Sequence, residues 1–373
     1  MVGSGTVAVE AVAYGKSGLY SDVDPLSCLL TRAKSRAVDP EWLLDSIKAI
    51  IEKAQPLARP GIEQREARKY IADLEGSTLF RAPPDVFHWF LPYVVINLCK
   101  TLANVAEMDG SSRRRDALLA TFAGTIRRLS RADPNTSSGL EVTKIMRKAL
   151  QSGLRFDLAS ELTRKADQLA RGYRALRKTV GIGEVKVAQH DARNWSALCA
   201  KHSTWPDLVV TSPCYISAIE YWRRHKLEYS WLGLVPPEKL SEVKHRFLGM
   251  GLEDPNTDQL PSYIQNLEMK LRKLDRVADA KVLARYFNDS VSWLTEISTV
   301  LRRSAGRAYI IVGGNTKHGV HLNTPLALRE IAKEVGLSTS VFMKYKIKNS
   351  YMQYPTNGTR IKVETVLKIA PES

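Results

Sequence analysis

Short apolar runs that end in polar residues are the feature that most constrains how this 373-residue chain can fold. Three of them lie in the second half, at residues 184–191 ("EVKVAQHD"), 207–212 ("DLVVTS") and 307–314 ("RAYIIVGG"). Their continuous apolar character is typical of strands that are buried on both faces. Helical patterns at residues 195–202 and 324–336 follow the first and third runs. This alternation favours an α/β fold with a doubly wound sheet and helices on both faces.

Strand patterns also occur near both ends of the chain. Residues 17–23 ("SGLYSDV") predict a short strand, and a helix follows at 26–36. Residues 338–347 ("STSVFMKYKI") and 360–369 ("RIKVETVLKI") alternate apolar and polar side chains. Two such neighbouring runs predict a C-terminal antiparallel hairpin.

The chain is strongly basic, with 55 Lys and Arg against 39 Asp and Glu and a net charge of +16. This balance favours a polyanionic partner such as a nucleic acid, although a basic solvated surface is the alternative. No apolar run reaches the roughly 18 residues that a membrane helix needs, and no signal segment opens the chain. We therefore expect a cytoplasmic protein.

Helical periodicity fills the middle of the chain, from about residue 40 to residue 180. Because so long a block is not a loop in a compact core, we interpret it as an inserted subdomain. The predicted division is a first core part (1–36), a helical insertion (37–182) and a second core part (183–373). Basic clusters make the insertion the candidate for nucleic-acid recognition. They are Arg113, Arg114 and Arg115, then Arg127, Arg128 and Arg131, then Lys144, Arg147 and Lys148.

Candidate ligand-binding residues lie where the predicted strands end, because ligands of open α/β sheets bind at the carboxyl ends of the strands. The loop at residues 3–6 ("GSGT") has two glycines before a helix start, which allows close approach of the backbone to a ligand. A helix-capping turn explains the loop equally well. Carboxylates at two strand ends can accept ribose hydroxyls, or can be surface groups and caps. The candidates are Gly3, Ser4, Gly5, Thr6, Asp22 and Asp191.

The stretch after residue 211, "SPCY", carries the candidate reaction chemistry. The amino group of a nucleobase is a poor nucleophile, because its lone pair is delocalised into the ring. A site that methylates it should accept hydrogen bonds from the N–H groups and clamp the ring. Ser212 offers a hydroxyl oxygen, Pro213 a carbonyl in a fixed direction and Tyr215 an aromatic face. A tight turn with Tyr215 in the core is the alternative.

With these residues in place, the sequence resembles the S-adenosylmethionine-dependent amino-group DNA methyltransferases, which modify cytosine N4 or adenine N6. The similar segments are residues 3–34, 190–233, 306–320 and 346–369, and the second is the most specific. The resemblance implies a Rossmann-like methyltransferase sheet and an enzyme of DNA methylation and restriction-modification. It also implies double-stranded DNA with a flipped base as substrate, and it leaves room for a cognate restriction nuclease as partner.

The resemblance also implies residue roles. Gly3, Ser4, Gly5 and Thr6 would approach the methionine part of S-adenosylmethionine, while Asp22 would bind its ribose and Asp191 would lie beside its adenine. Ser212, Pro213 and Tyr215 of the Ser-Pro-Pro-Tyr-type motif would hold the base. A serine at the first motif position is commoner in the cytosine-N4 members, so cytosine N4 is preferred over adenine N6. Arg223, Arg224 and Lys226 would contact phosphates next to the base, or form a solvated helix face.

Two features depart from the family pattern. Cys214 stands where the family has a second proline, which loosens the motif. The family also places a central strand before the glycine loop, so we expect either an upstream start or a curtailed cofactor site. A catalytically degenerate DNA-binding relative and an RNA substrate are alternatives. So is pyrimidine-C5 methylation with Cys214 as the nucleophile. Direct methyl transfer needs no metal, and no metal-ligand spacing is evident.

Overall fold

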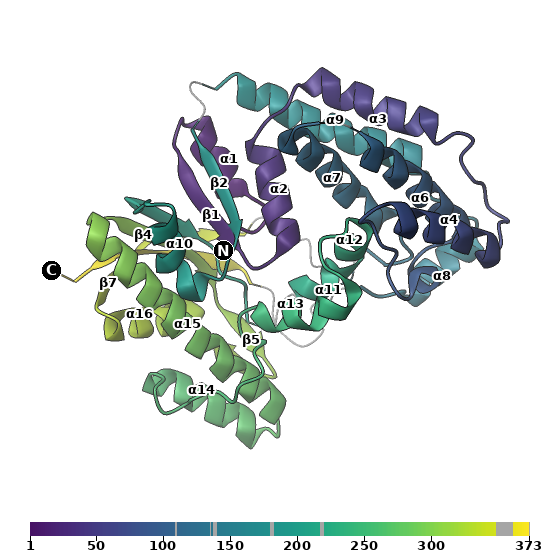
Figure 1. The fold of residues 1–373 in the computed structure, drawn as a ribbon. Helices are drawn as coiled ribbons and strands as arrows, with labels where there is room; N and C mark the ends of the chain where they lie inside the picture. The colour runs from purple at the N-terminus through teal and green to yellow at the C-terminus, as the bar shows by residue number, and fades with distance from the viewer. Residues whose placement is uncertain are drawn as a thin grey trace.

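The computed structural model of the chain has a helical part and a strand-bearing part that lie side by side (Figure 1). Among the residues that it describes, no helix is long and apolar enough to cross a membrane. The described residues are 1–108, 110–134, 136, 140–179, 183–216, 220–347 and 361–372.

The described strands form a mixed α/β arrangement with both parallel and antiparallel pairs. One sheet consists of β1 and β2 in parallel, and a second has the order β3-β4-β8-β7. In the second sheet β3 and β4 are parallel, whereas β8 is antiparallel to both β4 and β7. A short antiparallel ribbon joins β5 and β6. The bounds are β1 (Gly18–Asp22), β2 (Val185–Gln189), β3 (Leu208–Thr211), β4 (Arg307–Gly313), β5 (Asn315–Lys317), β6 (Val320–Leu322), β7 (Leu337–Lys346) and β8 (Val363–Pro371).

The predicted C-terminal hairpin is confirmed by the antiparallel pairing of β7 with β8. The register shifts by one residue between Val341 and Met343, which marks an irregularity in the exposed edge strand. Residues 348–360, which belong to the last of the segments similar to methyltransferases, lie outside the described residues.

A cavity separates the two main sheets. The edges of β1 and β3 that carry no partner strand both line it, and its volume is about 950 Å³. Met1 and Val2 lie at one end, where the Val2 N–H donates to the Ser21 carbonyl and the Thr211 hydroxyl donates to the Met1 carbonyl. The described strands therefore form two main sheets and a short ribbon, and the mixed α/β fold is confirmed. The single doubly wound sheet that the sequence predicts is not specifically shown by the described strands.

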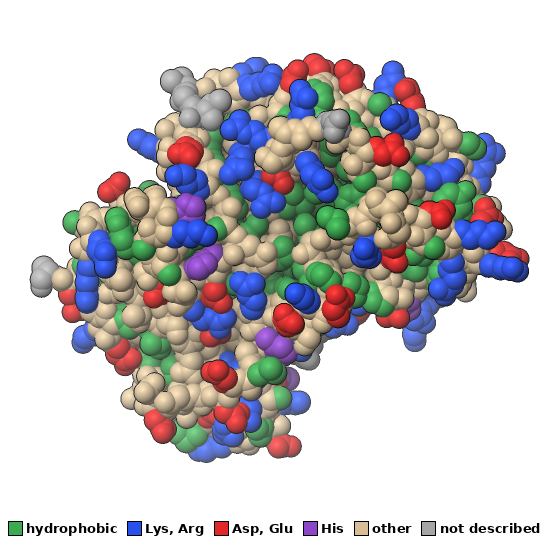
Figure 2. All heavy atoms as spheres, viewed as in Figure 1, with side chains coloured by type: hydrophobic (Ala, Val, Ile, Leu, Met, Phe, Trp, Pro, Cys, Tyr) green, Lys and Arg blue, Asp and Glu red, His purple; other side chains and the backbone are tan. Residues whose placement is uncertain are grey.

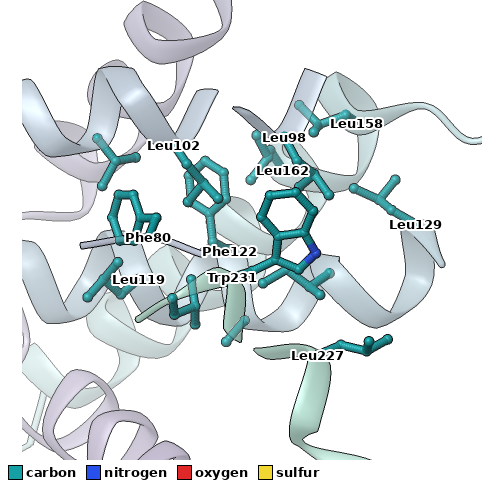
Figure 3. Close-up of a cluster of buried hydrophobic side chains, with 14 of the residues drawn as sticks. Phe80, Leu98, Leu102, Leu119, Phe122, Leu129, Leu158, Leu162, Leu227 and Trp231 are labelled. Carbon is teal, nitrogen blue, oxygen red and sulfur yellow. The ribbon is translucent and has the colours of Figure 1, made fainter. Parts of the chain in front are cut away.

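The helical part is built around one large apolar core. Its helices α3 to α9 enclose buried side chains such as Phe80 and Phe122 (Figure 3). Trp231 and Leu227, which come from the segment after residues 212–215, insert into the same core. The bounds are α3 (Pro40–Lys53), α4 (Gln64–Ser77), α5 (Val86–Trp89), α6 (Pro92–Glu107), α7 (Ser112–Ile126), η1 (Arg127–Leu129), α8 (Lys144–Gln151), α9 (Leu158–Arg177), α11 (Tyr221–Arg224), α12 (Lys226–Trp231), η3 (Pro237–Lys239) and α13 (Leu240–Arg246).

Two helices accompany the first sheet. The helix α1 (Thr6–Ala13) precedes β1, and α2 (Pro25–Ser35) follows it. Asp24 caps α2 by accepting from the Leu26 N–H, and Pro25 occupies the first turn, where a missing N–H costs nothing. This cap fixes the direction in which the chain leaves β1.

The second sheet has its own apolar core, which includes Ile310, Leu367 and Trp293. The longest helix that packs against this sheet covers 28 residues, and Ala305, which follows its last residue, has the left-handed conformation. The sequence did not predict this helix or the one before it. The bounds are η2 (Ala192–Asn194), α10 (Trp195–Lys201), α14 (Ser262–Lys273), α15 (Val277–Ser304) and α16 (Thr324–Glu334).

Candidate functional site

The glycine loop at residues 3–6 leads directly into α1. Gly3 and Gly5 have positive φ values of 54° and 88°, which glycine adopts readily. A Cβ on Gly5 would lie 2.8 Å from the Thr31 Cα, so the loop packs tightly against α2 there. A Cβ on Gly3 would meet nothing within 4 Å. The loop therefore has one closed side and one open side.

Asp22 lies against this loop at the end of β1. Its Oδ2 accepts from the Gly3 N–H at 2.9 Å, and its Oδ1 accepts from the Asp24 N–H at 3.1 Å. The side chain is 9% exposed. Two backbone donors thus fix the carboxylate beside the glycine loop. Carboxylate oxygens can accept more than one hydrogen bond each, so further donors can still be accommodated.

The motif at residues 212–215 begins next to the same loop. Thr211, the last residue of β3, donates its hydroxyl to the Met1 carbonyl at 3.0 Å. Ser212 is exposed and Pro213 is buried. The Cys214 carbonyl accepts from the Tyr286 hydroxyl at 2.9 Å, which ties the turn to α15. The structure therefore brings the end of β3 and the start of the glycine loop together.

The Cys214 thiol is held in its protonated form. Burial, and to a smaller extent the charge of the Asp22 carboxylate, raise the pKa of this thiol to about 12. A thiol with so high a pKa contributes almost no thiolate at neutral pH, and only the thiolate is a good nucleophile.

Tyr215 is oriented by a residue that the sequence reasoning missed. Its hydroxyl donates to Glu364 of β8, which also accepts from Tyr345 of β7. A Cβ on Gly313 would lie 3.4 Å from the Tyr215 ring, so the ring lies against the end of β4. The alternating pattern of apolar and polar residues in the hairpin gave no indication of this role of Glu364, because its partner Tyr215 lies 149 positions away in the chain.

Asp191 is engaged by a neighbouring arginine. Arg193 donates to both of its oxygens, at 3.0 Å to Oδ1 and 2.7 Å to Oδ2, and also to Asp289 at 2.6 Å. Burial by itself would raise the pKa of Asp191, but the hydrogen bonds from Arg193 outweigh it and lower this pKa. The structure thus directs Asp191 toward Arg193, a pairing that the sequence reasoning did not foresee.

The predicted basic cluster after the motif is half-buried. Arg223 pairs with Glu220 at 3.4 Å. The Lys226 ammonium lies 4.7 Å from the centroid of the Trp89 ring. A phosphate can compete with both contacts for the basic side chain, because ion pairs and cation–π contacts at the surface are weak. Arg224 is the third member, and it too is half-buried.

Comparisons with known proteins give one similarity and two negative results. The sequence is 22% identical over 374 aligned residues to the type II methyltransferase M.MvaI of Kocuria varians. The alignment covers 95% of this chain and 79% of that protein. No protein-family model matches the sequence, and no solved structure matches the chain. The similarity supports the resemblance to methyltransferases that the motifs indicate.

Proposed function

We propose that the chain is an S-adenosylmethionine-dependent DNA methyltransferase that acts on an exocyclic amino group, with cytosine N4 preferred. The observation that carries this proposal is the junction between the glycine loop and the motif. The Thr211 hydroxyl donates to the Met1 carbonyl, and Asp22 accepts from the Gly3 N–H. The methyl donor and the base that accepts the methyl group must meet at one place. These contacts join the two segments that are proposed to bind them. The similarity to M.MvaI supports the same conclusion.

The residues around Asp22 fit the proposed cofactor. The open side of Gly3 leaves room for a ligand against the backbone, and the fixed Asp22 carboxylate can accept ribose hydroxyls. Ser4, Gly5 and Thr6 would complete the loop at the N-terminus of α1. When bound, the cofactor supplies the methyl group of a sulfonium. Asp191 fits its proposed place beside the adenine less well, because Arg193 already holds it.

The motif would hold the base by hydrogen bonding and stacking. The exposed Ser212 hydroxyl and the Pro213 carbonyl would accept from the amino N–H groups, which frees the nitrogen lone pair for attack. Tyr215, held by Glu364, would present its ring to the base. The protonated thiol of Cys214 disfavours pyrimidine-C5 chemistry, because that reaction needs a thiolate. Adenine N6 is the alternative target.

Double-stranded DNA with one flipped base is the proposed substrate, and basic side chains on both parts support it (Figure 2). Within the helical insertion, Arg128 is already paired with Glu161 at 2.9 Å. In contrast, Lys144, Arg147 and Lys148 are exposed on α8. We propose that α8 contacts phosphates. A cytoplasmic location and a cognate nuclease belong to the same proposal.

The direct test of the motif is Ser212→Ala. Because the hydroxyl would act only on the base, single-turnover methyl transfer should fall by about 100-fold. The affinity for S-adenosylmethionine should stay within about twofold. Ser292→Ala, at an exposed position of α15, is the control and should change neither quantity. An unchanged transfer rate in Ser212→Ala would remove Ser212 from the mechanism.

A DNA-binding relative without methyl transfer is the second candidate. The pairing of Asp191 with Arg193 favours it, because both oxygens of the carboxylate proposed to lie beside the adenine already accept from a side chain. Calorimetric titration with S-adenosylmethionine separates the two candidates. Saturable binding with one site per chain supports the enzyme, and a folded protein that releases no heat supports the second candidate.

A further inference from the structure

A buried carboxylate links the two halves of the proposed site. Asp24 is 2% exposed, yet its side chain has four hydrogen-bonding partners. The Leu26 N–H and the Tyr229 hydroxyl reach its Oδ1 at 2.9 Å. The Ser27 hydroxyl reaches Oδ2 at 2.9 Å, and Nδ1 of His225 lies 2.8 Å from the same oxygen. This number of partners offsets the cost of burying the charge.

The contacts of Asp24 run in two directions. Its backbone N–H donates to Asp22, and Asp22 in turn accepts from Gly3 of the glycine loop. Its side chain contacts His225 and Tyr229, which lie at the junction of α11 with α12 and within α12. The segment that follows the motif is therefore anchored directly behind the carboxylate that faces the glycine loop.

The surroundings of His225 favour its charged form. Burial alone would lower the pKa of this histidine, but the hydrogen bond and charge of Asp24 raise it above its usual value of 6.5. The His225 side chain is 24% exposed, so protons from solvent can reach it. The titratable and charged groups that face it are Asp24 at the start of α2, Tyr221 and Arg224 of α11, and Glu228 and Tyr229 of α12.

We propose that Asp24, His225 and Tyr229 form a positioning cluster, which holds Asp22 and the glycine loop in place and makes cofactor affinity depend on pH. The cofactor part rests on the proposed function. The ion pair of His225 with Asp24 is complete below the ordinary histidine pKa of 6.5 and is lost as the pH rises through the higher folded pKa. The pKa of Asp24 is lowered, so its contribution is lost only when the pH falls below its ordinary value of 3.8.

The first test uses hydrogen exchange without any ligand. In His225→Gln and Tyr229→Phe, peptides that cover residues 3–6 and 18–26 should exchange several-fold faster, while peptides from α9 should not change. His245→Gln is the matched control, since that ring contacts the Met250 carbonyl instead. A role confined to general stability would accelerate exchange in α9 as well. Unchanged exchange at the glycine loop in both variants would overturn the proposal.

The second test measures cofactor affinity by calorimetry at pH 6 and pH 8.5. Wild-type affinity should fall by about three- to tenfold between these values. This is less than a charge-assisted hydrogen bond contributes directly, because His225 acts on the cofactor only through Asp24 and Asp22. Tyr229→Phe should keep this pH dependence at a lower affinity, and His225→Gln should lose it. The same pH profile in wild type and His225→Gln would overturn the pH linkage. If the wild-type protein binds no cofactor, but the two variants still show faster exchange at the glycine loop, the proposed function is contradicted and the positioning role is supported.

Discussion

Single residues decide which chemistry this site can perform. Cys214 follows a proline and therefore matches the residue pair of a C5 methyltransferase, but burial raises its thiol pKa to about 12. Ser212 stays exposed next to it. A hydroxyl that can accept a hydrogen bond is thus presented at the surface, while the potential nucleophile is kept neutral. This contrast supports the proposed transfer of a methyl group to an amino group over covalent catalysis by the thiol.

Cys214→Ser should therefore retain methyl transfer to within about tenfold, because the thiol is not expected to react and the change is nearly isosteric. Iodoacetamide at pH 7.5 should leave Cys214 of the native protein unlabelled, as peptide mass spectrometry can show. Rapid alkylation accompanied by loss of activity would contradict a thiol that stays protonated at neutral pH.

The glycine loop makes a second prediction at this scale. Gly5→Ala should lower the free energy of unfolding by about 2–4 kcal/mol, because the new Cβ meets both a positive φ and the Thr31 backbone. Gly153→Ala is the matched control, with a φ of 97° and nothing within 4 Å, and should cost only about 1–2 kcal/mol. Chemical denaturation measures both. Equal losses would show that the contact with Thr31 is unimportant.

Residue identities in motifs could be predicted from the sequence, but their partners could not. The strand-end rule pointed to Asp22, and the structure places it against the glycine loop. It gave no hint of the role of His225, because the partner of this histidine, Asp24, is 201 positions away in the sequence. Local patterns carry no information about such distant pairs.

At the scale of elements, the strands follow the sequence closely, because continuous apolar runs and alternating runs leave few choices. β1, β2, β3 and β4 lie within the predicted segments. The helices that the sequence missed, α14 and α15, mix charged and apolar residues without a strong start signal. The order of the strands in the sheets was harder to predict, because local patterns do not show which strands pair. The cavity between β1 and β3 lies where two strand edges are left without a partner.

A strand added to the amino end of Met1 should fill this cavity. Five or six Val- and Ile-rich residues fused there would enter between two edges that can both pair with them, starting from the Val2 contact with Ser21. We expect the free energy of unfolding to rise by about 2 kcal/mol after the entropy cost of ordering. A Gly-Ser extension of equal length should have no effect. Equal stability of the two fusions in urea would show that an added strand does not pair with β1 and β3 in this cavity.

Helix α12 anchors the motif segment in the helical part through Trp231 (Figure 3). Trp231→Ala should cost about 3–5 kcal/mol of unfolding free energy, as expected for removal of a fully buried aromatic side chain. Leu252→Ala, at a side chain that is 75% exposed, should cost less than about 0.5 kcal/mol. A small loss for Trp231→Ala would mean that α12 is only loosely attached.

For the whole molecule, the arrangement joins a helical part to a strand-bearing part through the segment after the motif (Figure 1). The sequence predicted a separate helical insertion ending at residue 182. It could not predict that residues 227 to 243 pack into the same core, because their apolar side chains fit a helix in either part. Hydrogen bonds of this segment with Asp24, which caps α2, then tie it to the end of β1 next to the glycine loop.

The most direct measurement is nucleoside analysis of DNA incubated with the purified protein and S-adenosylmethionine. After complete digestion, liquid chromatography with mass spectrometry distinguishes N4-methylcytosine, N6-methyladenine and 5-methylcytosine. We predict N4-methylcytosine with the wild-type protein and almost none with Ser212→Ala. The appearance of 5-methylcytosine, or the absence of any methylated nucleoside with a protein that binds the cofactor, would contradict methyl transfer to an amino group at this site.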